Sequence, residues 1–221
     1  DIVSRSINSE IRAGRATPNG GVYIQMSHLG PENVRKQFKG MVERCADSGF
    51  DLANDLVEVV PTAHYMMGGL VFKKDCSTDL PGLFAAGEDT GGVHGANRLG
   101  GNGVANSTVF GGIAGEAMAN WVSSVSLSDC NMDEVEAGIR EHEAPLKQLP
   151  GDIESIRDAL ADCMWDDVGI SRTRESLLRA SQTLKELASK LKQMGVGDIQ
   201  REYSNTWQDW MNLRNLILVS Q

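Results

Sequence analysis

The spacing of apolar and polar residues changes along this chain, and each spacing predicts a different element. Residues 1–13 carry apolar side chains near helical spacing, whereas residues 22–28 (VYIQMSH) alternate apolar and polar positions as a half-buried strand does. A helix is expected over residues 32–47, because Pro31 suits the first turn of a helix. The first sixty residues are therefore predicted to mix helices with strands.

The middle of the chain has shorter apolar runs. A strand is expected over residues 56–60, where Pro61 ends it, and two more are expected in the runs GLVF and GLFAAGE, the second ending at Glu88. Residues 104–122 then form a pattern of small side chains that predicts a helix able to pack closely on a sheet. Strands followed by a helix indicate an α/β arrangement.

From Asp133 onward the pattern is helical and charged. Three or four helices there predict a bundle, so the expected fold class is α/β plus all-α. Three tryptophans fall at helix spacing, and we expect them to pack between helices. They are Trp165, Trp207 and Trp210. The predicted helices are 132–146, 152–163, 174–193 and 203–219.

Net charge, apolar runs and cysteine spacing exclude several classes of protein. The 221 residues carry a formal charge of −9, which disfavours a nucleic-acid partner because phosphate contacts need clustered Lys and Arg. No run of about 18 apolar residues is present, so no membrane insertion is expected. The cysteines are scattered, without CxxC or HxxxH spacing, which favours a reduced, cytoplasmic compartment and predicts no metal site.

Glycine is concentrated in one segment. Ten of the 24 glycines lie between Gly87 and Gly115, and only five lie from Ser126 onward. A tight run of turns would account for some of them, but glycine also permits positive φ and close approach of the backbone to a ligand. The segment does not match GxGxxG or GxxxxGK[ST], which excludes both common nucleotide-binding loops.

The glycine-rich segment joins a predicted strand to a predicted helix start. Free N–H groups and the helix dipole make such a start electropositive, so it suits a phosphate, a carboxylate or the edge of a flavin. Arg98 lies in this segment, where a guanidinium can bind a carboxylate through two parallel hydrogen bonds. A surface arginine that bridges a loop is the alternative. His64 and His94 are candidates of the same kind, since a single histidine is either structural or a proton carrier.

Four motifs together resemble one family. PTAHYMMGG, LPGLFAAGE, GVHGANRLGGN and CMWDDVGISR are similar, in this order, to segments of the flavoprotein subunit of succinate dehydrogenases and fumarate reductases, to which aspartate oxidases are related. The resemblance covers nearly the whole chain, and HGANRLGGN after a strand ending in GE is its most specific part. It implies FAD as cofactor and hydride transfer between the flavin and a small dicarboxylate.

The resemblance also implies roles for individual residues. His64 and Arg98 match the family's catalytic, substrate-binding histidine and arginine, and Glu88 matches the glutamate that contacts FAD. Asn102, Gly103 and Val104 match the helix start that faces the flavin. At Gly103 and Val104 the family more often has Ser and Leu, so a hydroxyl contact to the flavin would be lost while backbone contacts remain.

The resemblance implies a layout and a larger parent chain. Residues 1–57 would complete a capping domain that closes over substrate, 58–125 would supply the carboxyl-side part of the FAD domain, and 126–221 most of a helical domain. The family's GxGxxG is not found, so the chain is expected to be an internal fragment that needs the rest of its own flavoprotein. An iron–sulfur subunit is an implied partner, and the location would be cytoplasmic or peripheral at the inner face of the cytoplasmic membrane.

Two other functions stay open. His64 and Arg98 would equally hold the carboxylates of an aspartate oxidase or another small-acid flavoenzyme. The acidic helical tail with its tryptophans would instead suit a catalytically silent interaction module.

Overall fold

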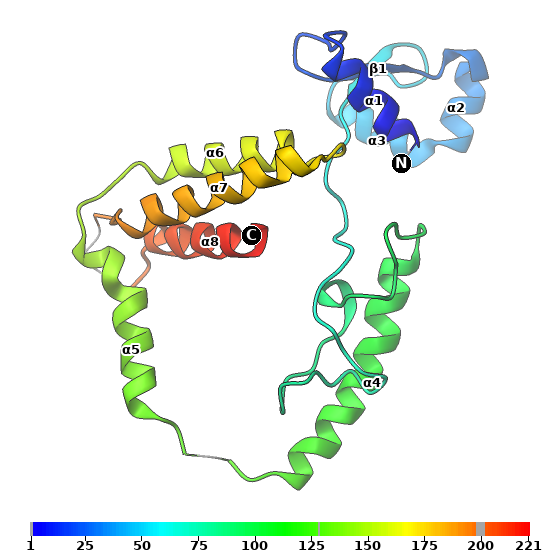
Figure 1. Ribbon diagram of the computed structural model, residues 1–221. Coiled ribbons are helices and arrows are strands. Elements are labelled where there is room, and N and C mark those ends of the chain that lie inside the picture. Colours follow the sequence, from blue (N-terminus) through cyan, green and yellow to red (C-terminus); the bar gives the residue numbers. More distant parts are fainter. Residues whose placement is uncertain (1, 128, 198–201) are drawn as a thin grey trace. The chain divides into compact units, whose positions relative to one another are not determined.

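The computed structural model describes residues 2–127, 129–197 and 202–221 (Figure 1). Contacts within the chain separate it into two compact units. The first unit combines residues 1–61 with residues 131–221, and the second consists of residues 62–130. We call the second the glycine-rich unit, and we call residues 131–221 of the first the helical bundle.

The first sixty residues form three helices and a two-stranded sheet. They are α1 (Ile2–Arg12), β1 (Val22–Gln25), α2 (Pro31–Gln37), α3 (Lys39–Asp47) and β2 (Leu56–Val59), with a 3₁₀ turn, η1 (Ser27–Leu29), before α2. The strands pair antiparallel with Val22 opposite Val59, which confirms both predicted strands. Val34 and Val57 are buried together in a small core.

The helix predicted over residues 32–47 is two helices. Phe38 separates them, with φ −117° and ψ 33°, outside the helical region. Its N–H still donates to the carbonyl of Val34, so the chain turns without losing that bond. Gly40, two residues further on, weakens any helix that would continue through this point.

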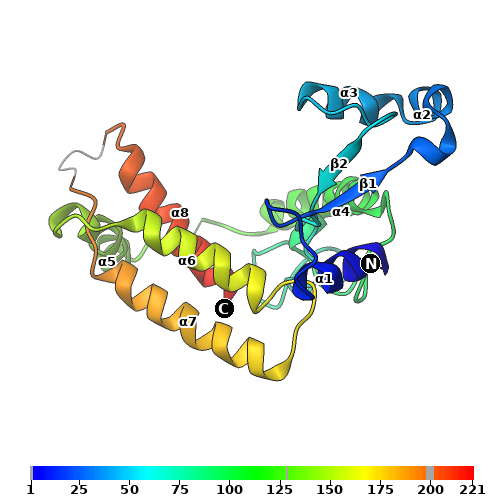
Figure 2. The ribbon, with the colours of Figure 1, turned by 90° about the horizontal axis from the view of Figure 1, so that it is seen from above.

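The described residues of the helical bundle form four α-helices. They are α5 (Met132–Glu143), α6 (Ile153–Asp166), α7 (Arg174–Lys192) and α8 (Asn205–Ser220), with a 3₁₀ turn, η3 (Ala144–Lys147), after α5. Figures 1 and 2 both show α6, α7 and α8 side by side, and their buried residues form the larger core of the protein. This confirms the predicted bundle.

Two of the three tryptophans pack as expected. Trp210 is 6% exposed, and its indole Nε1 donates to the carbonyls of Leu191 at 3.2 Å and Met194 at 3.0 Å, at the end of α7. Trp207 packs against the same core. Trp165 does not, because it is 45% exposed on α6 and lies off the face formed by Ile156 and Leu160. The prediction for Trp165 was therefore wrong.

The glycine-rich unit consists of extended segments, a 3₁₀ turn, η2 (Gly87–Asp89), and the long helix α4 (Asn102–Ser124). The strands predicted in GLVF and GLFAAGE are not formed. Leu70 makes a single parallel bridge to Thr90, and Ser77 makes a single antiparallel bridge to Phe84. Among the described residues these segments meet no further strand that would extend a bridge into a ladder, which is the physical reason for the difference.

Helix α4 is apolar on every side. Val104, Val109 and Val122 are all more than half exposed, although a helix with apolar residues all round is typical of a buried position. Despite this, no described helix combines the length and the apolar character needed to cross a bilayer.

Candidate functional site

Hydrogen bonds join two segments of the glycine-rich unit that are separated in sequence. The N–H of Leu70 donates to the carbonyl of Asp89 at 2.8 Å, and the N–H of Gly91 donates to the carbonyl of Leu70 at 3.0 Å. The carboxylate of Glu88 accepts from the N–H of Met66, also at 2.8 Å. These three bonds attach the segment that carries His64 to the segment that carries Glu88.

Gly69 allows this approach. A Cβ atom added there would lie 2.2 Å from the carbonyl oxygen of Asp89, and its φ of +131° is one that side-chain-bearing residues rarely adopt. Only glycine fits between the two segments.

The first turn of α4 comes next along the chain, after the segment that carries Glu88. Gly101 precedes the helix with φ +83°, in the left-handed region, and no side chain caps the helix start. Gly103 is buried, whereas Asn102 and Val104 are exposed. The backbone N–H groups of this turn therefore form an electropositive surface without a side-chain partner.

Arg98 lies beside this helix start. The central carbon of its guanidinium is 4.3 Å from the centroid of the Tyr65 ring. Its Nη1 donates to the carbonyl of Leu99 at 3.3 Å, while its Nε is buried without a hydrogen-bond partner. A Cβ atom at Gly103 would lie 2.8 Å from Cε2 of Tyr65 and 3.4 Å from Nη1 of Arg98, so Arg98, Tyr65 and the start of α4 meet at one place.

Behind Tyr65 lies a small polar network. Its hydroxyl is 3.2 Å from Nε2 of His94, and the two rings meet edge to face with centroids 5.4 Å apart. Asn106, on α4, is 4% exposed, and its Nδ2 lies 3.2 Å from the same nitrogen of His94. Nδ2 also donates to the carbonyl of Gly87 at 3.0 Å.

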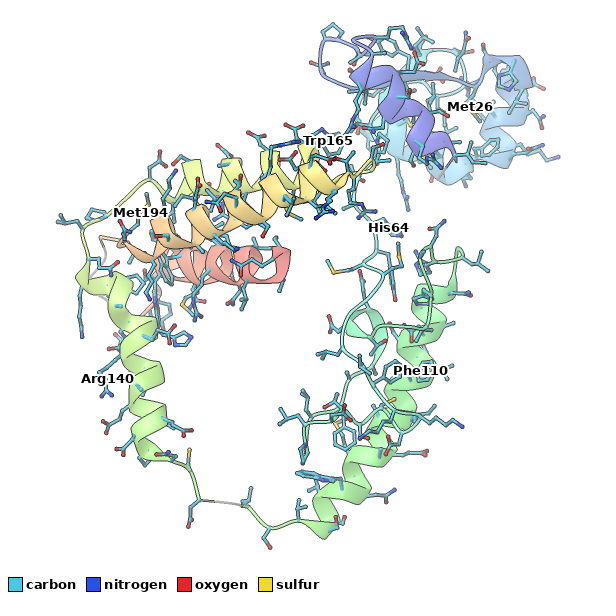
Figure 3. All side chains as sticks on the ribbon, in the orientation of Figure 1. Met26, His64, Phe110, Arg140, Trp165 and Met194 are labelled. Carbon is cyan, nitrogen blue, oxygen red and sulfur yellow. The ribbon has the colours of Figure 1, made fainter. Side chains whose placement is uncertain are left out.

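The structure brings some of the six predicted site residues together. Arg98 lies next to Gly103, in the turn that also contains Asn102 and Val104. Glu88 is bonded to the segment of His64 but not to His64 itself. His64 is exposed and makes no hydrogen bond to another described residue (Figure 3). Its role in substrate binding therefore stays a prediction.

Sequence reasoning missed Tyr65 and Asn106. Tyr65 directly follows His64 in PTAHYMMGG, so the motif contained the signal. The sequence contained no such signal for Asn106, because a single asparagine within a helical pattern does not indicate that its side chain is buried. Its buried Oδ1 has no hydrogen-bond partner, and such an atom is rare in a folded protein.

Two family models match the chain. The one described as the FAD binding domain matches residues 1–104, and the one described as the fumarate reductase flavoprotein C-term matches residues 157–221. The FAD-binding match therefore precedes the C-terminal match along the chain.

Several known proteins are similar over the whole chain. A fumarate reductase (CoM/CoB) subunit of Methanothermobacter marburgensis is 40% identical over 100% of this chain and 40% of its own length. L-aspartate oxidase of Pseudomonas aeruginosa is 33% identical over 100% of this chain and 39% of its own length. Among solved structures, Mycobacterium smegmatis Sdh1 in complex with UQ1 matches with a TM-score of 0.89 and 34% identity, over 99% of this chain and 37% of that one.

The chain thus spans about 40% of the length of the curated relatives it matches. This coverage agrees with the expected fragment, and the mixed fold of helices and a small sheet agrees with the solved structure. The motifs, the family models and the relatives lead to one conclusion. The chain belongs to the flavoprotein subunit family of succinate dehydrogenases and fumarate reductases, and it carries part of the FAD-binding domain and the C-terminal helical domain of that family.

Proposed function

We propose that the flavoprotein to which this chain belongs interconverts succinate and fumarate. The observation that carries the proposal is the position of Arg98, whose guanidinium lies beside the uncapped start of α4. A dicarboxylate needs fixed cations and donors in a site with little water, where such groups act most strongly. Two relatives named as subunits of fumarate reductases, from Methanothermobacter marburgensis and Wolinella succinogenes, support this proposal.

The residues at the site fit an FAD cofactor. The uncapped N–H groups at Gly103 and Val104 suit the electron-rich edge of a flavin, and they would stabilise negative charge there. Glu88 uses one carboxylate oxygen for the N–H of Met66, which leaves the other to accept from a second donor. When bound, FAD supplies the hydride chemistry that none of these side chains can supply.

The chain's own residues hold the substrate. Arg98 presents a planar fork of donors that matches a carboxylate. We propose that His64, which is exposed at the edge of the same unit, binds the second carboxylate. With both ends fixed, the central carbons of the substrate are oriented for reaction, and orientation of this kind lowers the barrier.

Replacement of Arg98 by lysine tests the proposal. In the purified flavoprotein with FAD loaded, Arg98→Lys is expected to retain the flavin absorbance and to lower kcat/KM for fumarate by about 100-fold, since lysine cannot form the two-point contact. Arg140→Lys is the matched control, because Arg140 is two-thirds exposed on α5. Turnover by Arg98→Lys equal to that of Arg140→Lys would remove the assigned role of Arg98.

An aspartate oxidase is the second candidate. The observation in its favour is the 33% identity to an L-aspartate oxidase over the full chain. Arg98 would hold a carboxylate of aspartate in the same way. Assays of the flavoprotein with succinate, fumarate and L-aspartate, each with oxygen and with an artificial electron acceptor, separate the two functions. Oxidation of aspartate without turnover of succinate or fumarate would reject the first proposal.

The domain layout and the partners are part of the same proposal. Residues 1–57 would belong to a capping domain, 58–125 to the FAD domain and 126–221 to the helical domain. The helical bundle would contact an iron–sulfur subunit, with the assembly peripheral at the inner face of the cytoplasmic membrane. The word "subunit" in the names of several relatives supports this. Co-purification of the tagged flavoprotein with a protein that shows the iron–sulfur absorbance is the expected result, and purification of the flavoprotein alone would contradict it.

A further inference from the structure

We propose that Tyr65 is a positioning residue that orients the guanidinium of Arg98 for the substrate carboxylate. The inference rests on the proposed function and adds a residue to it. Tyr65 and Arg98 both lie in the glycine-rich unit, from segments more than thirty residues apart in sequence.

The contacts of Arg98 leave the tyrosine ring as its main support. Its guanidinium carbon is 4.3 Å from the ring centroid, a distance at which a cation is attracted to the face of an aromatic ring. The hydrogen bond from Nη1 goes to the adjacent residue, Leu99, at 3.3 Å, and a bond to a chain neighbour leaves the far end of the group free to swing. The buried Nε has no partner at all among the described residues. The ring therefore sets the plane of the guanidinium.

The ring is itself held in place on two sides. One edge of the ring packs against the first turn of α4, where a Cβ atom at Gly103 would lie 2.8 Å from Cε2. The hydroxyl lies 3.2 Å from Nε2 of His94 and 3.4 Å from Nδ2 of Asn106. Asn106 is 4% exposed and is anchored to the carbonyl of Gly87, so the ring is fixed relative to α4.

This arrangement matters for binding because a two-point contact depends on the plane of the guanidinium. Without the ring, the guanidinium must be ordered at the moment the carboxylate binds, and ordering a flexible side chain weakens affinity by up to about tenfold. Loss of the ring should therefore weaken carboxylate binding by about tenfold. Loss of the hydroxyl alone should have a smaller effect, because the ring remains.

The test measures binding and turnover in the FAD-loaded flavoprotein. Malonate is the binding probe, because this dicarboxylate lacks the adjacent pair of carbons that succinate loses hydrogen from. Its dissociation constant is measured by calorimetry, and KM and kcat are measured with fumarate. The variants are Tyr65→Leu and Tyr65→Phe, with Tyr203→Leu as control because Tyr203 is fully exposed. Tyr65→Met serves in place of Tyr65→Leu if the leucine variant does not fold.

We expect Tyr65→Leu to raise the malonate dissociation constant and KM by about tenfold each, with kcat changed less than about threefold. Tyr65→Phe should stay within about threefold of the wild type, and Tyr203→Leu should equal it. In an Arg98→Lys background, Tyr65→Leu should change malonate binding by less than about twofold, because its effect passes through Arg98.

Wild-type malonate affinity in Tyr65→Leu would overturn the inference and leave the proposed function standing. An equal loss with and without Arg98→Lys would also overturn it, since Tyr65 would then act independently of Arg98. A wild-type protein that neither binds malonate nor converts a dicarboxylate would instead refute the proposed function, and the inference with it. That result is visible before any variant is made.

Discussion

Gly69 is the position at which the glycine-rich unit is expected to tolerate a side chain least. It lies between the segment that carries His64 and Tyr65 and the segment around Asp89. The substitution to consider is Gly69→Ala, which adds a single methyl group. Gly68→Ala is its matched control, because Gly68 also has a positive φ, +104°, but nothing lies within 4 Å of an added Cβ.

The expected magnitude follows from the distances. The added Cβ would start 2.2 Å from the carbonyl oxygen of Asp89, whereas ordinary contact begins at 3.4 Å, so the two backbones must separate by about 1 Å. A shift of that size breaks the hydrogen bonds of Leu70 to Asp89 and of Gly91 to Leu70. At about 1 kcal/mol each, their loss lowers the free energy of local opening by about 2 kcal/mol. The strain of a positive φ is common to both variants.

Hydrogen–deuterium exchange read by mass spectrometry measures this opening directly. The amides to follow are those of Leu70 and Gly91, which donate the two bonds. Because 1.4 kcal/mol is a factor of ten, Gly69→Ala should speed their exchange about 30-fold beyond Gly68→Ala. Equal exchange in Gly68→Ala and Gly69→Ala would show that close approach at residue 69 does not hold the two segments together.

Three further predictions concern other parts of the chain. Leu213 is fully buried in the bundle, so Leu213→Ala should lower the free energy of unfolding by about 2–5 kcal/mol. Leu218 is 63% exposed, so Leu218→Ala should change the free energy of unfolding by less than about 0.5 kcal/mol. Urea unfolding followed by tryptophan fluorescence compares the two variants, and equal losses would contradict the assigned core. Burial raises the pKa of the Cys76 thiol, so iodoacetamide should modify Cys76 more slowly than the exposed Cys130, and equal rates by mass spectrometry would refute this. Hydrogen bonds from Thr17 and Asn19, in the loop before β1, hold the pKa of Glu58 below its ordinary 4.5. Glu58 therefore stabilises the fold above pH 4.5 and loses its contribution as the pH falls through its folded-state pKa. The difference in unfolding free energy between wild type and Glu58→Gln should shrink on acidification. A difference that stays constant with pH would contradict the assigned hydrogen bonds.

Local patterns predicted most helices because their signals are contained in short segments. Alternation over residues 22–28 and the short apolar run over 56–60, ended by Pro61, predicted both strands of the sheet. The runs GLVF and GLFAAGE were predicted as strands, but a strand needs a partner, and an apolar run does not reveal whether one is present. The break at Phe38 and the exposure of Trp165 also depend on the surrounding fold rather than on the local sequence.

The candidate site was predictable where a residue type implies a chemistry. An arginine among glycines at a helix start indicated a carboxylate site, and Arg98 does lie against the first turn of α4. The support behind Arg98 was not predictable, because Tyr65 and Asn106 act through contacts over 19 to 41 residues of sequence. A tyrosine or an asparagine has many structural uses, and only its neighbours in space distinguish them.

The indole of Trp210 joins α8 to the C-terminal end of α7 by hydrogen bonds. Few backbone donors reach the last carbonyls of a helix, and here a side chain of α8 donates to the carbonyl of Leu191, in the last turn of α7, and to that of Met194, just after the helix. Leu191 also accepts from the backbone N–H of Met194 at 3.0 Å, so the indole adds a second donor to this carbonyl when α8 docks. Folding of α7 and docking of α8 should therefore be cooperative. Substitution of Trp210 should change the unfolding rate of the bundle even if it leaves the helix content unchanged.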